Sequence, residues 1–472
     1  MPTDSLRIHL SLVSHTNIGK TTLARTLLSR DIGEVADREH VTETTDDYVL
    51  ARNAEGCELI LWDTPGFGNS VALAKRLSGR SNPVGWFLSE VWDRMANKSQ
   101  WLNQKALKHV KDTSSVVLYL VNATELPETA PYVQAEMRIL EWIGKPVIVL
   151  LNQIGVPQPA DVEAAQIERW KSAMQSYPIV REVLSMDAFA RCWVQEFTLF
   201  DAIGSVLEEE QQPAFEAVRE VWSRQRRAAY SSSIQALGFY IDKLAKDQEV
   251  AATPGMVDQL KLWGKRFKLK IGDEVHDPAE AAQTALSARS VDDFCALTDK
   301  LISINGLKGK GVRKELLQRM RSDWSVKSAV DPKQAAVAGA IGTGAAGGLA
   351  ADLATGGLSL GLGTLIGSVV GALGGAGIAV AYNHQKDASG TVVMWSDSAL
   401  MNLFIDAALL YLAVAHFGRG RGNWVEGEYP AHWRAAVEET IRDRQLKGRT
   451  LASSFDAVIR EVLCRLYPNA QF

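Results

Sequence analysis

The sequence predicts an α/β domain built on a mostly parallel sheet, followed by a mainly α-helical C-terminal half that contains a glycine-rich helical hairpin. Continuous apolar runs such as SVVLYLVNA and PVIVLLN alternate with helical patterns over residues 1–205, as in parallel sheets covered on both faces. Charged, helix-periodic segments replace them after residue 206. An Ala/Gly-dominated run then follows at 335–383.

The length of 472 residues allows two to four domains, since a domain has about 100–200 residues. We expect the first domain at 1–205, a helical domain at 206–334, the hairpin at 335–383, and a C-terminal helical region at 384–472 that packs with the second domain. The formal net charge of −4 gives no global basic field, so no DNA partner is expected.

The cysteines and the N-terminus bear on the compartment. Cys57, Cys192, Cys295 and Cys464 are far apart and show no paired spacing, which is typical of a reduced compartment. The start MPTDSLRIHL lacks the basic and apolar segments of a secretory signal. The sequence therefore predicts a cytoplasmic protein, with peripheral attachment to the inner membrane, or insertion in it, as open alternatives.

The segment SHTNIGKTT has the residues of a phosphate-binding loop at the start of a helix. Such a loop needs inward backbone N–H groups, one fixed positive charge and a hydroxyl for magnesium. Gly19 allows close backbone approach, Lys20 can reach the β- and γ-phosphates, and Thr21 can coordinate the metal ion. Ser14 replaces the usual glycine and costs backbone freedom. The residues expected to surround the phosphates are Ser14, Asn17, Ile18, Gly19, Lys20, Thr21 and Thr22.

A second motif, ELILWDTPGFG, places an aspartate at the end of an apolar strand and follows it with Thr-Pro-Gly. We expect Asp63 to hold magnesium through water and the N–H group of Gly66 to sense the γ-phosphate. Alone, such a tetrapeptide is a common turn. About forty residues after a Lys-Thr loop, it indicates a P-loop NTPase.

The polar segment DREHVTETTDD between these motifs is expected to be the first switch, in which a threonine closes over the metal ion. Spacing from the loop lysine favours Thr42, whereas spacing to the motif aspartate favours Thr44 or Thr45. A solvated polar loop is the alternative. The expected catalytic residues are Lys20, Thr42 and Gly66, and the expected magnesium ligands are Thr21, Thr42 and Asp63.

The base side departs most from the pattern of a guanine site. After the strand PVIVLL comes NQIG, where guanine recognition uses Asn-Lys-x-Asp. Asn152 is in place, but Gln153 replaces the lysine that stacks on the base and Gly155 replaces the aspartate. Losing that carboxylate removes a charge-assisted pair, so guanine selectivity stays open.

Asp187 lies in SMDAFA, where a Ser-Ala loop would support the base. Its carboxylate could substitute for the missing aspartate. Equally, it could cap a helix that begins at Ala188.

The residue after Asp-Thr-Pro-Gly is Phe67, in the place of a water-positioning glutamine. A phenyl ring cannot orient water, so we expect slow intrinsic turnover, with hydrolysis assisted by another group, a partner or a nucleotide-dependent dimer. The eight histidines show no metal-ligand spacing, and each is expected to be an ordinary surface or core residue.

With these motifs, residues 1–205 resemble the Era/TrmE-type (HSR1-related) branch of P-loop GTPases, through NIGKTT and WDTPG. The strings LSMDAFARCWVQE and AHFGRGRGNW resemble a narrower bacterial family, GTPases that carry a C-terminal domain of unknown function 3482. The resemblance covers nearly the whole chain. It implies a GTPase fold, GTP and GDP as ligands, and magnesium as a cofactor.

The resemblance also implies two less common features. Members of the narrower family are often encoded beside a predicted membrane protein, which implies a membrane partner. In some relatives of the Era/TrmE branch, the asparagine of the phosphate loop binds a potassium ion that supplies positive charge to the transition state. Asn17 matches that position and is the candidate potassium ligand.

The glycine-rich segment LSLGLGTLIGSVVGALGGAGIAVAY carries no charge over 25 residues, which is long enough for a helix to cross a hydrocarbon core. Glycines at every fourth position form one stripe, on which a second helix can pack closely. So many glycines make a poor helix in water, which favours a membrane, whereas burial in a soluble core is the alternative. The apolar helix at 399–417 contains Asp406 and is expected to be a core helix.

These expectations combine into one function. We expect a GTP-binding switch that hydrolyses GTP slowly and couples its nucleotide state to a membrane or membrane-protein partner through the helical C-terminal half. The alternatives are a nucleotide-dependent assembly or scaffold protein with a soluble buried hairpin, and a base-promiscuous NTPase.

Overall fold

The computed structural model describes eleven stretches of the chain: 6–28, 46–79, 81–89, 98–153, 159–188, 192–251, 278–307, 382–387, 390–416, 430–446 and 450–468. Three of the expected features lie outside these residues. They are the switch threonines Thr42, Thr44 and Thr45, Gly155, and positions 335–381 of the expected hairpin.

A six-stranded sheet with the order β2-β3-β1-β4-β5-β6 forms the N-terminal domain. The strands are β1 (Arg7–Val13), β2 (Asp46–Arg52), β3 (Glu58–Asp63), β4 (Val116–Asn122), β5 (Val147–Asn152) and β6 (Val180–Ser185). β2 pairs antiparallel with β3, and all the other pairings are parallel. The expected mostly parallel sheet is therefore confirmed.

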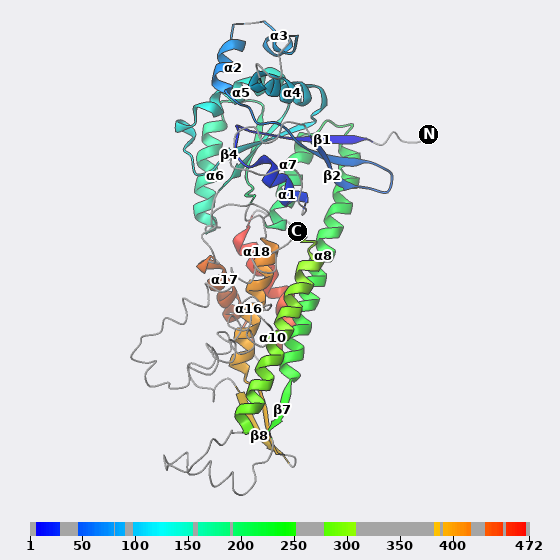
Figure 1. The fold of residues 1–472 in the computed structure, drawn as a ribbon, viewed down its shortest axis with the longest axis vertical. Coiled ribbons are helices and arrows are strands. Elements are labelled where there is room, and N and C mark those ends of the chain that lie inside the picture. The colour runs from blue at the N-terminus through cyan, green and yellow to red at the C-terminus, as the bar shows by residue number, and fades with distance from the viewer. Residues whose placement is uncertain are drawn as a thin grey trace.

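The helices of this domain cover both faces of the sheet, as Figure 1 shows. They are α1 (Lys20–Leu28), α2 (Ser70–Leu77), α3 (Pro83–Ser89), α4 (Lys98–Thr113), α5 (Pro131–Ile143), α6 (Ala160–Met174) and α7 (Trp193–Val206). Alternate residues of β4 enter two separate cores. Leu118 and Leu120 pack in the core that includes α1 and α7, whereas Val117 and Val121 pack in the core that includes α2 and α5.

Five helices form most of the described residues of the C-terminal half: α8 (Gln212–Lys246), α10 (Pro278–Ile304), α16 (Asp397–Ala415), α17 (Ala431–Asp443) and α18 (Leu451–Leu466). The 35 residues of α8 span about 50 Å at the usual rise of an α-helix. α8 packs against β2, β3 and α7 near its start, and it also packs against α10, α16 and α18. Figure 1 shows it running from the sheet along the length of the helical half.

α16 is the expected core helix at 399–417. Within the described residues it is the one helix long and apolar enough to cross a membrane, but most of it is buried inside the protein. Its Asp406 accepts a 2.9 Å hydrogen bond from Arg434 of α17, so the charge inside the apolar run has a partner. Trp193 at the start of α7 donates a 3.1 Å bond to the Tyr411 hydroxyl and joins α16 to the sheet domain.

The expected mainly helical C-terminal half is confirmed, and it also contains a small antiparallel sheet with the order β7-β9-β8. It consists of β7 (Gln248–Ala251), β8 (Tyr382–Asp387) and β9 (Gly390–Trp395). It lies at the far end of α8 and α10 from the large sheet (Figure 1). Its strands have four to six residues and come from distant parts of the chain, so no local sequence pattern predicts them.

Candidate nucleotide site

The phosphate loop begins where β1 ends and leads directly into α1. Its backbone is left-handed at Asn17, with φ of +63°, and at Gly19, with φ of +97°. Asparagine tolerates this conformation better than most residues with a side chain. At Gly19 a Cβ atom would lie 2.8 Å from Nδ2 of Asn152, so only glycine fits there.

Lys20 is buried, and its ammonium group donates a 3.1 Å hydrogen bond to the hydroxyl of Ser14. That hydroxyl in turn donates to the carbonyl oxygen of His15. Burial lowers the pKa of Lys20, and the charges of Asp63 and Glu136 oppose that decrease. Ser14 therefore holds the lysine beside the loop, although it stands where the usual pattern has glycine.

Thr21 and Asp63 form the part of the site that fits magnesium. The threonine hydroxyl donates a hydrogen bond to Oδ2 of Asp63, which brings the start of α1 to the end of β3. The other carboxylate oxygen, Oδ1, is buried and has no hydrogen-bond partner in the described part of the chain. Burial raises the pKa of Asp63 to about 6, and Lys20 opposes that increase. A hard cation with oxygen ligands would satisfy this orphaned oxygen, so the residues fit magnesium.

Gly66 and Phe67 lie directly against the phosphate loop. The N–H group of Phe67 donates a 2.9 Å bond to the carbonyl oxygen of Ser14, and Phe67 forms a parallel β-bridge with His15. A Cβ atom on Gly66 would lie 2.9 Å from Nζ of Lys20, so a side chain at this position would displace the lysine. The ring of Phe67 is fully buried in a hydrophobic core.

On the base side, Asn152 joins two loops. Its Nδ2 donates a 2.7 Å bond to the carbonyl oxygen of Ile18, and its Oδ1 accepts a 2.8 Å bond from the N–H group of Ala188. Gln153 has a left-handed backbone with φ of +59°, and its side chain contacts the carbonyl oxygen of Asn17 at 3.4 Å. These amides therefore support the phosphate loop from the base side.

Asp187 is buried next to Ala188, and so the structure brings it to the same end of the sheet as Asn152. A helix beginning at Ala188 would run into residues 189–191, which lie outside the described residues, so the capping alternative for Asp187 stays a prediction. The helix α7 begins at Trp193, with Cys192 as its N-cap residue.

No sequence pattern predicts a buried network that lies beside the loop. The Nδ1 atom of His15 lies 2.8 Å from Oε1 of Glu136, and the hydroxyl of Tyr119 donates a 2.8 Å bond to Oε2 of the same carboxylate. His15 and Glu136 are 121 positions apart, and Glu136 lies among apolar residues of α5. Only the position of His15 inside the loop motif hints at a special role.

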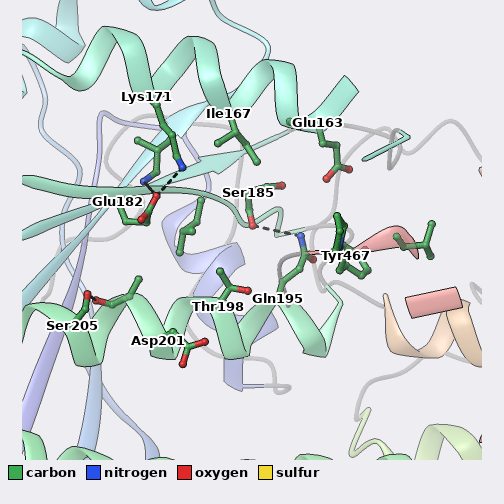
Figure 2. A pocket seen from close by; sticks show the side chains of 16 residues that line it. Glu163, Ile167, Lys171, Glu182, Ser185, Gln195, Thr198, Asp201, Ser205 and Tyr467 are labelled. Atoms are coloured by element: carbon green, nitrogen blue, oxygen red, sulfur yellow. Dashed lines mark hydrogen bonds and ion pairs between the residues drawn. The ribbon is translucent and has the colours of Figure 1, made fainter. Parts of the chain in front are cut away.

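A separate cavity of about 520 Å³ lies between α6, β6 and α7, and residues 466–468 near the C-terminus line it too. Figure 2 shows the Lys171–Glu182 ion pair on one side of it and Gln195 donating to the carbonyl oxygen of Ser185 on another. None of the phosphate-loop residues lines it. It is therefore distinct from the candidate nucleotide site.

Comparison with known families assigns two parts of the chain. Residues 9–153 match the family described as 50S ribosome-binding GTPase, and residues 323–459 match the domain of unknown function DUF3482. Both expected resemblances are therefore confirmed. The first match contains all the phosphate-site residues described above. No curated protein matches the chain.

Several solved structures of GTP-binding proteins are similar to part of the chain. Era from Aquifex aeolicus, bound to GDP and aluminium fluoride, has 19% identity over 43% of this chain and 58% of its own, with a TM-score of 0.33. Era in complex with MgGDPNP and a fragment of 16S ribosomal RNA has 18% identity with the same coverage and TM-score. A probable GTP-binding protein engB has 16% identity over 45% of this chain and 99% of its own, with a TM-score of 0.26. The chain thus spans 58% of the length of the Era structures it matches.

Proposed function

We propose, on the premise that residues 9–153 form a P-loop GTPase domain, that this chain is a GTP-binding switch that hydrolyses GTP slowly. We further propose that its helical half couples the nucleotide state to a membrane or membrane-protein partner. The observation that carries the switch is the convergence of Lys20, the Thr21–Asp63 pair and Gly66 on one loop. These are the groups that a phosphate chain with magnesium requires.

In this proposal Lys20 exchanges its bond to Ser14 for the β- and γ-phosphates of GTP. The N–H groups at the start of α1 add further donors to the phosphates. Thr21 and Asp63 hold magnesium, which neutralises charge on the phosphates when it is bound. The Gly66 N–H group donates to the γ-phosphate. In the first switch, Thr42, which is not among the described residues, closes over the metal ion. Loss of the γ-phosphate on hydrolysis releases both segments.

Slow turnover follows from Phe67, whose buried ring has no group that orients water. The side chain of Asn17 is exposed at the loop and could hold potassium, which would supply the missing positive charge. We expect potassium to raise the rate of GTP hydrolysis relative to sodium, and Asn17→Ala to abolish that increase. Equal rates in the two salts would contradict the potassium role.

A nucleotide-dependent dimer is the alternative source of a catalytic group. A rate of hydrolysis per molecule that rises with protein concentration would favour the dimer.

The helix α8 is the element that can carry the nucleotide state to the C-terminal half. It packs against β2, which follows the first switch in sequence, and against β3, which ends at Asp63. The guanidinium of Arg226 donates to both oxygens of the buried Glu196 in α7, at 2.9 and 3.2 Å. Farther along α8, the hydroxyl of Tyr230 donates a 2.9 Å bond to the carboxylate of Asp456 in α18. A shift of the switch segments would therefore move helices of the distal half.

The membrane part of the proposal is supported by the uncharged run at 358–382 and implies location at the cytoplasmic side of the inner membrane. It is tested by flotation of the intact protein with liposomes and with native membranes, in GTP and in GDP. A variant that lacks 335–381 is the comparison, with retained nucleotide binding as its folding control. We expect flotation of the intact protein alone. An intact protein that ignores both kinds of membrane in both nucleotides would contradict the membrane role.

A further inference from the structure

Glu136 is a fully buried carboxylate whose charge raises the pKa of Lys20, but whose hydrogen bonds have no role in the nucleotide chemistry described so far. Both of its oxygens are engaged, Oε1 with His15 in the phosphate loop and Oε2 with the hydroxyl of Tyr119 in β4. Burial and the charge of Glu136 raise the pKa of Tyr119 well above its ordinary value, so the phenol remains a donor. A buried carboxylate is retained in a fold only where such bonds satisfy it. The carboxylate therefore joins three elements: β4, α5 and the loop.

His15 is held from two directions. Its ring stacks on Tyr132 of α5 with the ring centres 4.7 Å apart, and its Nδ1 bonds to Glu136 of the same helix. Its backbone forms the β-bridge with Phe67, the residue that directly follows Gly66. The side chain thus connects α5 to the loop, and the backbone connects the loop to the segment that contains the γ-phosphate sensor.

We propose that Glu136 is a positioning residue of the GTPase reaction, which acts through His15 to fix the phosphate loop against the 64–68 segment. In this way it sets where the N–H group of Gly66 meets the γ-phosphate. The proposal rests on the proposed GTPase function. It matters here because Phe67 cannot orient water, so the reaction depends on the placement of backbone donors at the γ-phosphate.

The expected effect is specific to the triphosphate. GDP lacks the γ-phosphate, and the groups expected to hold its phosphates, Lys20 and Thr21, belong to α1. Asn152 also supports the loop from its other side through the carbonyl oxygen of Ile18. Loosening the His15 side should therefore leave GDP binding nearly intact and impair the step that depends on the γ-phosphate.

The first test is Glu136→Gln in the full chain, with Glu141→Gln on the same helix as the matched control. We expect kcat for GTP hydrolysis to fall about 10-fold, while KM and the Kd for GDP change less than about 3-fold. Tyr119→Phe removes only the donor to Oε2, and we expect a smaller loss of kcat in the same direction. Glu141→Gln should match the wild type in all three quantities.

The second test is a double-mutant cycle with His15→Ala. If Glu136 acts through His15, the double variant should lose no more kcat than the more impaired single variant. If the losses of kcat in the two single variants multiply in the double variant, this result would contradict action through His15. Equal losses of GTP and GDP affinity in Glu136→Gln would contradict a positioning role, because they indicate a general structural defect. If that variant does not fold, Tyr119→Phe decides by the same comparison.

The two proposals fail in different ways. A wild-type protein that neither binds nor hydrolyses GTP would contradict the proposed function. An active wild type whose Glu136→Gln and Tyr119→Phe variants keep full kcat would contradict this inference alone.

Discussion

Two polar clusters lie along the central strands β1 and β3. The phosphate site, at their carboxyl ends, contains Lys20, Thr21 and Asp63. The second, which we call the histidine cluster, lies farther back on the same strands and consists of His9, Ser11, Trp62, His109 and Ser114. In the histidine cluster, Trp62 donates a 2.9 Å bond to Nδ1 of His9, and the Ser11 hydroxyl lies 3.0 Å from Nε2 of His109.

The two clusters differ in what they leave unsatisfied. The polar groups of the histidine cluster bond to one another, and burial lowers the pKa of His109 to about 4 and also lowers that of His9. Its histidines are therefore neutral near pH 7. The phosphate site contains the buried ammonium group of Lys20, and beside it the carboxylate oxygen Oδ1 of Asp63 has no hydrogen-bond partner in the described residues. Burial of polar residues does not mark a ligand site by itself, whereas unmet bonding capacity beside a fixed charge does.

The largest expected effect is at the phosphate site. Lys20→Ala removes the only cation of the phosphate-loop motif, and we expect the affinity for GTP to fall at least about 100-fold, or about 3 kcal/mol. A titration with fluorescent GTP measures it, with the exposed Lys108→Ala on α4 as the control. Affinity within a few-fold of the wild type would break the distinction between the two clusters.

Asn152→Ala is expected to act mainly on stability. It leaves the carbonyl oxygen of Ile18 and the N–H group of Ala188 without their partner, and each loss costs about 1–3 kcal/mol. We expect the free energy of unfolding to fall by about 2–3 kcal/mol in urea titrations, with an unchanged ratio of GTP to ATP affinity. Unchanged stability with a lost base preference would show instead that this side chain reads the base.

The histidine cluster should govern stability at acid pH. Because the pKa of His109 is lowered, the unfolded chain takes up a proton near pH 6.5, whereas the folded chain does so only at about pH 4. The free energy of unfolding should therefore be fully retained above pH 6.5 and decrease as the pH falls toward 4. His9 favours the shift, and Asp47 and Asp112 oppose it. Since the ring is only partly buried, we expect a total loss of about 1–2 kcal/mol.

His109→Gln tests this directly, because the amide can keep the bond to Ser11 without titrating. Urea unfolding at pH 7 and pH 5 should show a weaker pH dependence in the variant than in the wild type. The same dependence in both proteins would assign the acid sensitivity to other groups. GTP affinity at pH 7 should not change.

The smallest expected effect is that of Ser14→Gly, which restores the usual loop residue. Glycine adds backbone freedom to the unfolded chain, so we expect a stability loss of about 0.5–1 kcal/mol. GTP affinity should stay within about 3-fold of the wild type, since in the proposed function Lys20 exchanges its bond to the Ser14 hydroxyl for the phosphates. A large loss of affinity would show that this hydroxyl itself takes part in binding.

The sequence predicts that the two main parts of the candidate phosphate site lie together, because they follow adjacent parallel strands. Lys20 comes just after β1 and Asp63 ends β3, so pairing of the two strands is enough to bring them together. The contact between His15 and Glu136 has no such pattern, since it depends on how the distant helix α5 packs. The edge strands β2 and β6 are not predicted from the sequence, because exposed and half-exposed residues interrupt their apolar runs.

The distal half shows the same limit of sequence reasoning. The composition of α16, apolar except for a few polar residues such as Asp406, is enough to predict a core helix. The pairing of β7 with β9 joins residues near 250 to residues near 392, and only the packing of the intervening helices brings these strands together. The sequence motif predicts Asn152 as a base-side residue. Its two bonds, to Ile18 and Ala188, depend on how the loops are arranged in space and have no sequence pattern.

The most direct test of the central claim is an equilibrium titration of the intact protein with GTP, GDP and ATP, with and without magnesium. We expect GTP and GDP to bind, GTP to bind more tightly with magnesium, and ATP to bind at least about 10-fold more weakly than GTP. Equal affinity for GTP and ATP, or GTP binding that ignores magnesium, would contradict a magnesium-dependent guanine-nucleotide switch.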